Sequence, residues 1–176
     1  MRLPLTMIAI AALPAHAADC DRPPADAADI AKAALHVEDN ADDGDLGVHG
    51  LIDDESWQRL CVFDPSGQLI LDITAGGGIA GLGLSCVFFE SHEPGYDDWG
   101  YDALRVAFPE GEYRVVALNT DGSAVSGAAH FTTVLPLAPE ILAPSTVPEH
   151  DDGPVPTVPL ADLTVEWAPV TASRDG

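Results

Sequence analysis

Basic residues are scarce in this chain. Its 176 residues contain 7 lysines and arginines against 29 aspartates and glutamates, a formal net charge of −22 at pH 7. A surface with this balance repels the phosphates of nucleic acids and the headgroups of anionic lipids. We therefore expect no nucleic-acid partner. The same surface suits divalent cations, basic partners or simple solvation.

Cysteine is also rare, and no pair has the C-x-x-C spacing of thiol-redox and zinc sites. The histidines show no H-x-H or H-x-x-x-H spacing, so the pattern indicates no zinc or copper site. The three cysteines are Cys20, Cys61 and Cys86. Cys61 and Cys86 lie in strand-like runs, whereas Cys20 lies in a loose N-terminal segment. We expect a disulfide between Cys61 and Cys86; the alternative is two buried thiols on strands that do not meet.

Long apolar runs are missing after the N-terminus, so we expect no segment inserted in a membrane. The chain begins with Met1-Arg2 and an apolar stretch that ends in Ala15-His16-Ala17. This is the pattern of a secretory signal peptide over residues 1–17, and it is too short for a membrane-spanning helix of about 20 residues. The sequence therefore predicts export to the periplasm or the extracellular space.

The chain contains instead many short alternating segments separated by turn residues. The clearest is residues 108–133, where Tyr113, Val115 and Ala117 share one face and Asp121-Gly122 supplies a tight turn before a second alternating run. Tyr113 follows a Pro-Glu-Gly corner, where its phenol can hydrogen-bond back across the edge of a sandwich. About eight such segments predict an all-β antiparallel sandwich.

Other segments give local expectations. Leu46, Val48, Gly50 and Ile52 should share the buried face of a strand at 46–52. Asp64-Pro65-Ser66-Gly67 should close a hairpin between strands at 58–63 and 69–74 as a type I turn. We expect a core or sheet-edge position for Trp57, a mobile glycine-rich loop at 75–84, a buried strand at 86–89 and a short strand or helical turn at 103–108.

The composition divides the chain into five parts. We predict a signal peptide at 1–17, a loosely ordered leader at 18–34, a β-sandwich domain at 35–137, a proline-rich acidic linker at 138–160 and the opening strand of a second, truncated module at 161–176.

Two motifs carry a resemblance to a known family. The sequence from Pro109 to Val115, with its following turn at 119–122, resembles the penultimate strand and final hairpin of fibronectin type III modules, which are immunoglobulin-like β-sandwiches. Leu163 to Val170 looks like an early strand of such a module, the one that carries its core tryptophan, here Trp167. More broadly, residues 35–176 are similar to exported bacterial proteins of unassigned function with a fibronectin-like domain.

The resemblance implies a fold and says little about activity. Two strands cannot bury a sandwich core, so we expect the chain to be a fragment of a longer product with further β modules. The alternative is that the last strand packs on the first module or on a partner.

The most acidic segment, residues 38–45, is a candidate calcium site. It combines hard oxygen ligands with a turn-forming glycine, as calcium requires. If strands at 35–37 and 85–91 pair, further carboxylates from Glu90 and Glu93 join the set. The candidate ligands are Glu38, Asn40, Asp43, Asp45 and Glu90. The alternative is a solvated acidic turn.

Catalytic patterns are weak. The sequence around Ser85 lacks the second glycine of a nucleophile elbow, and no pair of carboxylates stands out for glycoside cleavage. Tyr96, Trp99 and Tyr101 lie in one acidic loop; they can stack on a sugar or a partner side chain, or cover one end of the core.

These observations predict an exported, non-catalytic β-sandwich module with a structural, adhesive or binding role at the cell envelope or outside the cell. Its partner would be a protein or a glycan. A calcium-dependent or carbohydrate-binding module is the alternative, and a hydrolase is a distant one. We expect no cofactor other than calcium.

Overall fold

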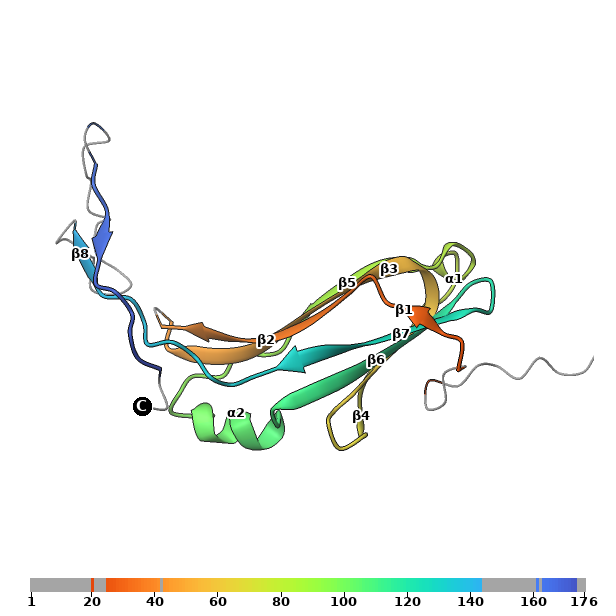
Figure 1. Ribbon diagram of the computed structural model, residues 1–176, viewed down its shortest axis with the longest axis horizontal. Helices are drawn as coiled ribbons and strands as arrows, with labels where there is room; N and C mark the ends of the chain where they lie inside the picture. Colours follow the sequence, from red (N-terminus) through yellow and green to blue (C-terminus); the bar gives the residue numbers. More distant parts are fainter. Residues whose placement is uncertain (1–19, 21–24, 42, 144–160, 162, 174–176) are drawn as a thin grey trace, which may run out of the picture.

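A computed structural model describes residue 20 and residues 25–41, 43–143, 161 and 163–173. The predicted signal peptide at 1–17 and linker residues 144–160 lie outside this part of the chain. The described part is all-β apart from two short helices (Figure 1). Its strands are β1 (Ala28–Asp29), β2 (Lys32–Asn40), β3 (Asp45–Phe63), β4 (Leu69–Thr74), β5 (Leu84–Glu90), β6 (Gly111–Asn119), β7 (Ala124–Phe131), β8 (Ile141–Ala143) and β9 (Glu166–Trp167), and its helices are α1 (Ile79–Leu82) and α2 (Tyr101–Ala107).

Strand β3 organises the fold. It is 19 residues long and pairs with β2 and β5 along its first part, then with β4 and β6 along its second. Strand β7 pairs with β6, and β1 adds to β7, so the strands form one curled seven-stranded sheet (Figure 1). The sequence had suggested two separate strands at 46–52 and 58–63. The structure joins them through a bend at Ser56, whose φ is 41°.

The glycine at position 83 allows this bend. Gly83 has a φ of 79°, and a Cβ on it would lie 2.5 Å from the backbone carbon of Ser56. Only glycine permits so close an approach in this backbone conformation. The bend therefore curls the sheet so that its two parts enclose a common core.

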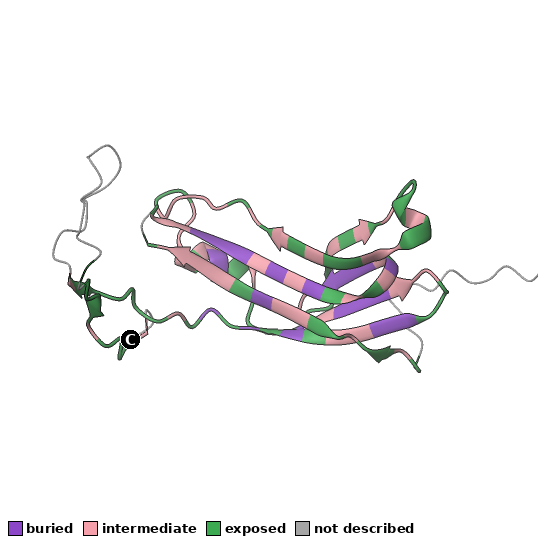
Figure 2. Cartoon of the chain, turned by 90° about the horizontal axis from the view of Figure 1, so that it is seen from above, coloured by how far each residue is buried: buried purple, intermediate pink, exposed green. Residues whose placement is uncertain are grey.

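The core lies between the two parts of the curled sheet. The alternation predicted for the first part of β3 is confirmed, because Leu46, Val48 and Ile52 are all buried. Trp57, next to the bend, is fully buried. Figure 2 shows the same alternation of buried and exposed positions along the strands. The other buried members include Leu35, Leu60, Val62, Leu104, Tyr113, Val115, Ala117, Val125, Ala129 and Phe131.

Both predicted hairpin turns are confirmed. Strands β3 and β4 are joined by the turn in which the Gly67 N–H donates to the Asp64 carbonyl at 2.9 Å. Strands β6 and β7 are joined at Gly122, whose φ is 87°. The predicted tyrosine corner is also present: the Tyr113 hydroxyl donates to the Pro109 carbonyl at 3.0 Å.

Several local expectations differ from the structure. Ala28–Asp29 pairs with β7, and β2 begins at Lys32, so ordered strands reach into the predicted leader. Helix α1 lies within the glycine-rich segment that was expected to be a loop, and α2 decides the 103–108 segment in favour of a helix. Strand β5 exists as predicted but is not buried: Phe88 is 59% exposed. Its only pairing partner among the described strands is β3, so one of its edges is open.

The prediction of a Cys61–Cys86 disulfide is wrong. Cys61 is bonded to Cys20, and both are buried against Phe63 and Val116. Cys86 is exposed and free. The reason is the register of β3, which places Cys86 opposite Asp53, before the bend, whereas Cys61 lies beyond it.

Strands β8 and β9 form a separate two-stranded sheet near the C-terminus. The expected inward position of Trp167 is not found, because its side chain is 59% exposed. A two-stranded sheet has no second layer to cover it. Within the described residues, no helix has both the length and the apolar character needed to cross a membrane.

Candidate functional site

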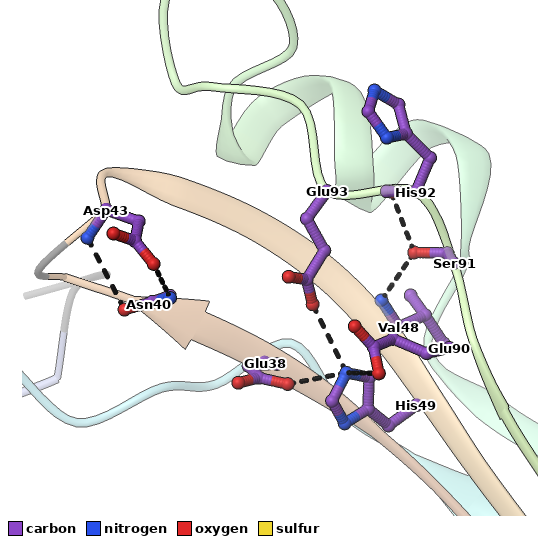
Figure 3. Close-up of polar contacts among 9 residues, drawn as sticks. All are labelled: Glu38, Asn40, Asp43, Val48, His49, Glu90, Ser91, His92 and Glu93. Carbon is purple, nitrogen blue, oxygen red and sulfur yellow. Dashed lines mark hydrogen bonds and ion pairs between the residues drawn. The ribbon is translucent and has the colours of Figure 1, made fainter.

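The predicted calcium ligands separate into two groups. In the β2–β3 turn, the Asn40 side-chain amide donates to Asp43 Oδ2 at 2.6 Å, and the Asp43 N–H donates to Asn40 Oδ1 at 3.4 Å. These two side chains therefore close the turn. Asp45 begins β3, and its Oδ1 is buried with no hydrogen-bond partner among the described residues. Asn40 and Asp43 lie apart from Glu38 and Glu90 (Figure 3).

Glu38 and Glu90 converge instead on a histidine that the sequence had not singled out. Figure 3 shows them pointing toward His49 from either side, together with Glu93 from the segment after β5. Their origins are β2, β3, β5 and the loop that follows β5. We call this group the His49 cluster; its members are Glu38, His49, Glu90 and Glu93.

The pairing of the strands explains the convergence. His49 lies in the middle strand, opposite His36 of β2 and opposite Glu90 of β5. Glu38 lies two residues after His36, so it projects from the same face of the sheet. Because inward positions of β3 alternate with outward ones, this face is opposite to the one that Val48 buries in the core.

The distances within the cluster are short. His49 Nε2 lies 2.5 Å from Glu38 Oε2, 3.2 Å from Glu93 Oε1 and 3.9 Å from Glu90 Oε2. One ligand atom each from Glu38, His49 and Glu93 can be chosen so that all lie within 4.8 Å of one another. Three groups that bind metals in proteins thus surround one small volume, and Glu90 lies beside it, 3.9 Å from His49 Nε2.

Burial differs across the cluster. The side chains of His49 and Glu93 are only 15% and 19% exposed, whereas that of Glu90 is 51% exposed. The His49 ring also makes edge contacts with Phe88 and His36, at centroid distances of 5.5 and 6.0 Å. The imidazole is therefore held from several sides, and the cluster opens to solvent on the Glu90 side.

Glycine at position 47 makes room for Glu93. A Cβ on Gly47 would lie 2.6 Å from Glu93 Cγ and 2.7 Å from its Oε1. The segment that carries Glu93 is fixed to β3 on both sides, since the Ser91 N–H donates to the Val48 carbonyl and the Leu46 N–H donates to the Pro94 carbonyl. The Glu93 side chain therefore crosses β3 directly over Gly47 to reach His49.

A small apolar pocket adjoins this segment. It has a volume of about 480 Å³ and is lined by Ser91, His92, Pro94, Asp98, Trp99 and Phe108. Tyr96, Trp99 and Tyr101 all pack against the core. Of the two readings of this aromatic loop, covering the core is therefore confirmed, and Trp99 also contributes to the pocket.

Ser85, the candidate nucleophile, lies at an exposed position of β5. His92, the histidine nearest to Ser85 in the sequence, lines the apolar pocket. The structure does not bring the two residues into hydrogen-bonding contact, and Ser91 rather than Ser85 bonds to the main chain of His92, at 3.0 Å.

The fold and site define the chain as an all-β domain with a histidine–carboxylate cluster on the outer face of its sheet. No family model, no curated protein and no solved structure matches the chain. The geometry of the cluster itself is therefore the basis for a proposed function.

The sequence contains one signal that could have identified His49. The short β2–β3 turn pairs Asn40 with Asp45, and this register places His36 opposite His49 and Glu38 opposite Gly47. The positions of Glu38 and His49 could thus have been predicted by counting residues back from the β2–β3 turn. Glu90 and Glu93 depend on the pairing of β5 with β3, which no local pattern specifies.

Proposed function

We propose that this protein is an exported, non-catalytic β module with a binding role at the cell envelope or outside the cell, and that it binds a divalent cation at the His49 cluster. The observation that carries the proposal is the convergence of three carboxylates on one imidazole, with Glu38 coming from β2 and the other two from residues 90–93. Structural or adhesive work is compatible with such a site, since a bound cation can join segments or bridge to a partner.

The charge balance of the cluster supports a cation. In the described part of the chain, the ion pairs of Glu38, Glu90 and Glu93 all go to His49. Even a protonated imidazole leaves an excess of negative charge among four groups. The net charge of −22 also raises the local concentration of cations around the protein.

Two features support export and the relation to fibronectin type III modules. The N-terminal sequence has the pattern of a signal peptide, and the buried Cys20–Cys61 bridge suits an oxidising compartment. The hydrogen bond of Tyr113 to Pro109 and the β6–β7 hairpin are features that immunoglobulin-like sandwiches share. We extend the proposal to β9 as the opening strand of a second module, whose further strands would cover Trp167.

The test is a thermal-shift and calorimetric screen of protein stripped with EDTA and titrated with Mg²⁺, Ca²⁺, Mn²⁺ and Zn²⁺. At least one ion should bind with one-to-one stoichiometry and raise the Tm. At 100 times its Kd, an ion that binds only the folded state adds about 2.7 kcal/mol to the free energy of unfolding. Glu93→Gln should weaken the response.

Glu112→Gln is the matched control, because Glu112 also contacts a histidine, His130 at 2.9 Å, but both side chains are highly exposed. This control should respond to ions as the wild type does. If none of the four ions binds or shifts the Tm, the proposed function is refuted.

A second candidate function is the binding of a glycan or another flat apolar ligand in the pocket beside Trp99. The specific observation is the volume of about 480 Å³ next to an indole and the Phe108 ring. Glycan-array binding should then be lost in Trp99→Ala and kept in Trp167→Ala, which removes an exposed indole elsewhere. Equal binding by both variants would exclude the pocket.

A further inference from the structure

We infer that the ion at the His49 cluster is a late transition metal of the zinc class rather than calcium, and that Gly47 is a positioning residue for this site. The inference rests on the proposed function and identifies the ligand of the same site. It differs from the sequence prediction in both the metal and the ligands, because three of the five predicted ligands lie in or beside the β2–β3 turn.

The donor set selects the metal. Calcium and magnesium take oxygen ligands almost without exception, whereas imidazole nitrogen suits zinc, copper, nickel and iron. His49 is central to the cluster, since all three carboxylates lie within 3.9 Å of its Nε2. An ion at this position must accept the nitrogen as a ligand.

The spacing agrees with a small ion. Zinc–nitrogen and zinc–oxygen bonds are about 2.0–2.2 Å long, which places tetrahedral ligand atoms about 3.3–3.6 Å apart. The distances from His49 Nε2 to the carboxylate oxygens, 2.5, 3.2 and 3.9 Å, bracket this spacing. Side-chain rotation of Glu38 and Glu90 is therefore enough to admit the ion, while the paired backbones of β2, β3 and β5 stay in place.

The ligands form an incomplete cage. Glu38, His49 and Glu93 supply three donors, and the more exposed Glu90 or a water supplies the fourth. The contact with the Phe88 ring, at 5.5 Å between centroids, restrains the imidazole. This is the arrangement of three protein donors with one open position that zinc accepts readily.

Gly47 provides an independent observation. Its φ is not in the left-handed region, so the backbone alone does not require glycine there. Any larger residue would place its Cβ 2.6 Å from Glu93 Cγ, within the path by which Glu93 reaches His49. A glycine within a strand lowers its stability. At position 47 it leaves room for the Glu93 side chain.

The alternative is that protonated His49 is itself the cation that the carboxylates hold. It makes a different prediction, because then no transition metal binds at His49 and its replacement leaves metal affinity unchanged. The experiment below separates the two.

Isothermal titration calorimetry of the EDTA-stripped protein with ZnCl₂ and CaCl₂ tests the inference. We expect one Zn²⁺ per chain and binding of Ca²⁺ at least about 100-fold weaker. His49→Gln should lower Zn²⁺ affinity about 100-fold or more, and Gly47→Ala, which keeps every ligand, about 10-fold or more. His130→Gln, which removes the exposed histidine paired with Glu112, should leave the affinity unchanged.

Two readouts separate positioning from a general loss of structure. Co²⁺ bound in place of Zn²⁺ should give the intense visible absorption of a four-coordinate site in the wild type, and Gly47→Ala should weaken it. The Tm of metal-free Gly47→Ala is measured alongside. If this variant does not fold, Glu93→Gln removes the same ligand without a clash.

The possible results overturn different parts of the proposal. Preferential binding of Ca²⁺, or Zn²⁺ binding that His49→Gln does not weaken, overturns the zinc assignment and leaves the proposed cation-binding function standing. Unchanged Zn²⁺ affinity in a folded Gly47→Ala protein overturns the role of Gly47. If neither ion binds and the wider ion screen is also negative, the proposed function and the inference both fail.

Discussion

Removal of the Cys20–Cys61 disulfide should cost this domain a large part of its stability. The bridge joins residues separated by 41 positions in the sequence. In the chain-entropy model, closing a loop of this length restricts the unfolded chain by about 4 kcal/mol at 25 °C. Both cysteines lie in a buried cluster with Phe63 and Val116. We therefore expect no rearrangement of the native state that offsets the loss of the bridge. A loss of about 4 kcal/mol corresponds to a fall in Tm of about 8–16 °C for a chain of this size.

Guanidinium unfolding followed by tryptophan fluorescence measures this loss. The test variant is the double substitution Cys20→Ser with Cys61→Ser, which leaves no new unpaired thiol at the site. Cys86→Ser is the control; since Cys86 is exposed and free, its replacement should change the free energy of unfolding by less than about 0.5 kcal/mol. Peptide mapping without reduction should recover the Cys20–Cys61 pair. A mapped Cys61–Cys86 pair, or equal losses in the two proteins, would refute the reasoning.

Three further substitutions test the packing and the corner. Gly50→Ala places a Cβ 2.1 Å from Phe89 Cε1, so thermal unfolding should show a loss of about 1–3 kcal/mol from overpacking. Tyr113→Phe removes the corner hydrogen bond and should cost about 1 kcal/mol in urea. Burial raises the pKa of Tyr113 to about 12. The neutral phenol therefore stabilises the fold fully below about pH 10, and this stabilisation is lost as the pH rises through about 12. In that range the Tm should fall more steeply in the wild type than in Tyr113→Phe. Hydrogen bonds, of which the one from the Thr133 N–H has the largest effect, hold the pKa of Glu110 below its usual range. The Glu110 carboxylate therefore stabilises the fold above about pH 4.3, and this stabilisation is lost as the pH falls further. Glu110→Gln should make the Tm less dependent on pH on the acid side.

Matched controls accompany these substitutions. Gly76→Ala adds a methyl group where nothing lies within 4 Å, so it should be near neutral, and a Gly50→Ala protein of equal stability would contradict the packing argument. Glu112→Gln serves for Glu110, since Glu112 contacts an exposed histidine rather than the end of β7. An identical acid profile in the two glutamine variants would show that the hydrogen bonds to Glu110 are unimportant. For Tyr113, a Tm that falls equally in wild type and variant above pH 10 would contradict the assignment.

Local patterns predicted most of the strands and their turns. The alternation of Leu46, Val48 and Ile52 reflects the two-residue period of a strand with one buried face, and it needs no distant partner to be recognised. The turns at Gly67 and Gly122 follow from backbone angles that favour glycine. The corner at Tyr113 depends on a carbonyl only four residues away. Each of these features is encoded within a few consecutive residues.

Features that join distant segments could not be predicted in this way. The bend at Ser56 turns two expected strands into one, and the course of β3 then decides which cysteine reaches Cys61. Strand β5 was expected to be buried because its residues are apolar. In the described part of the chain it pairs with β3 alone, so one of its edges is open. Apolar character alone does not distinguish a central strand from an edge strand.

The candidate site shows the same division. An acidic turn that contains Glu38 could be predicted from residues 38–45, because turn chemistry is a local property. That Glu90 and Glu93 meet Glu38 at His49 depends on the tertiary structure, since they arrive through the pairing of β5 with β3 and across Gly47. A cluster made by three strands is set by their mutual register, and register between strands distant in sequence is a property of the folded chain.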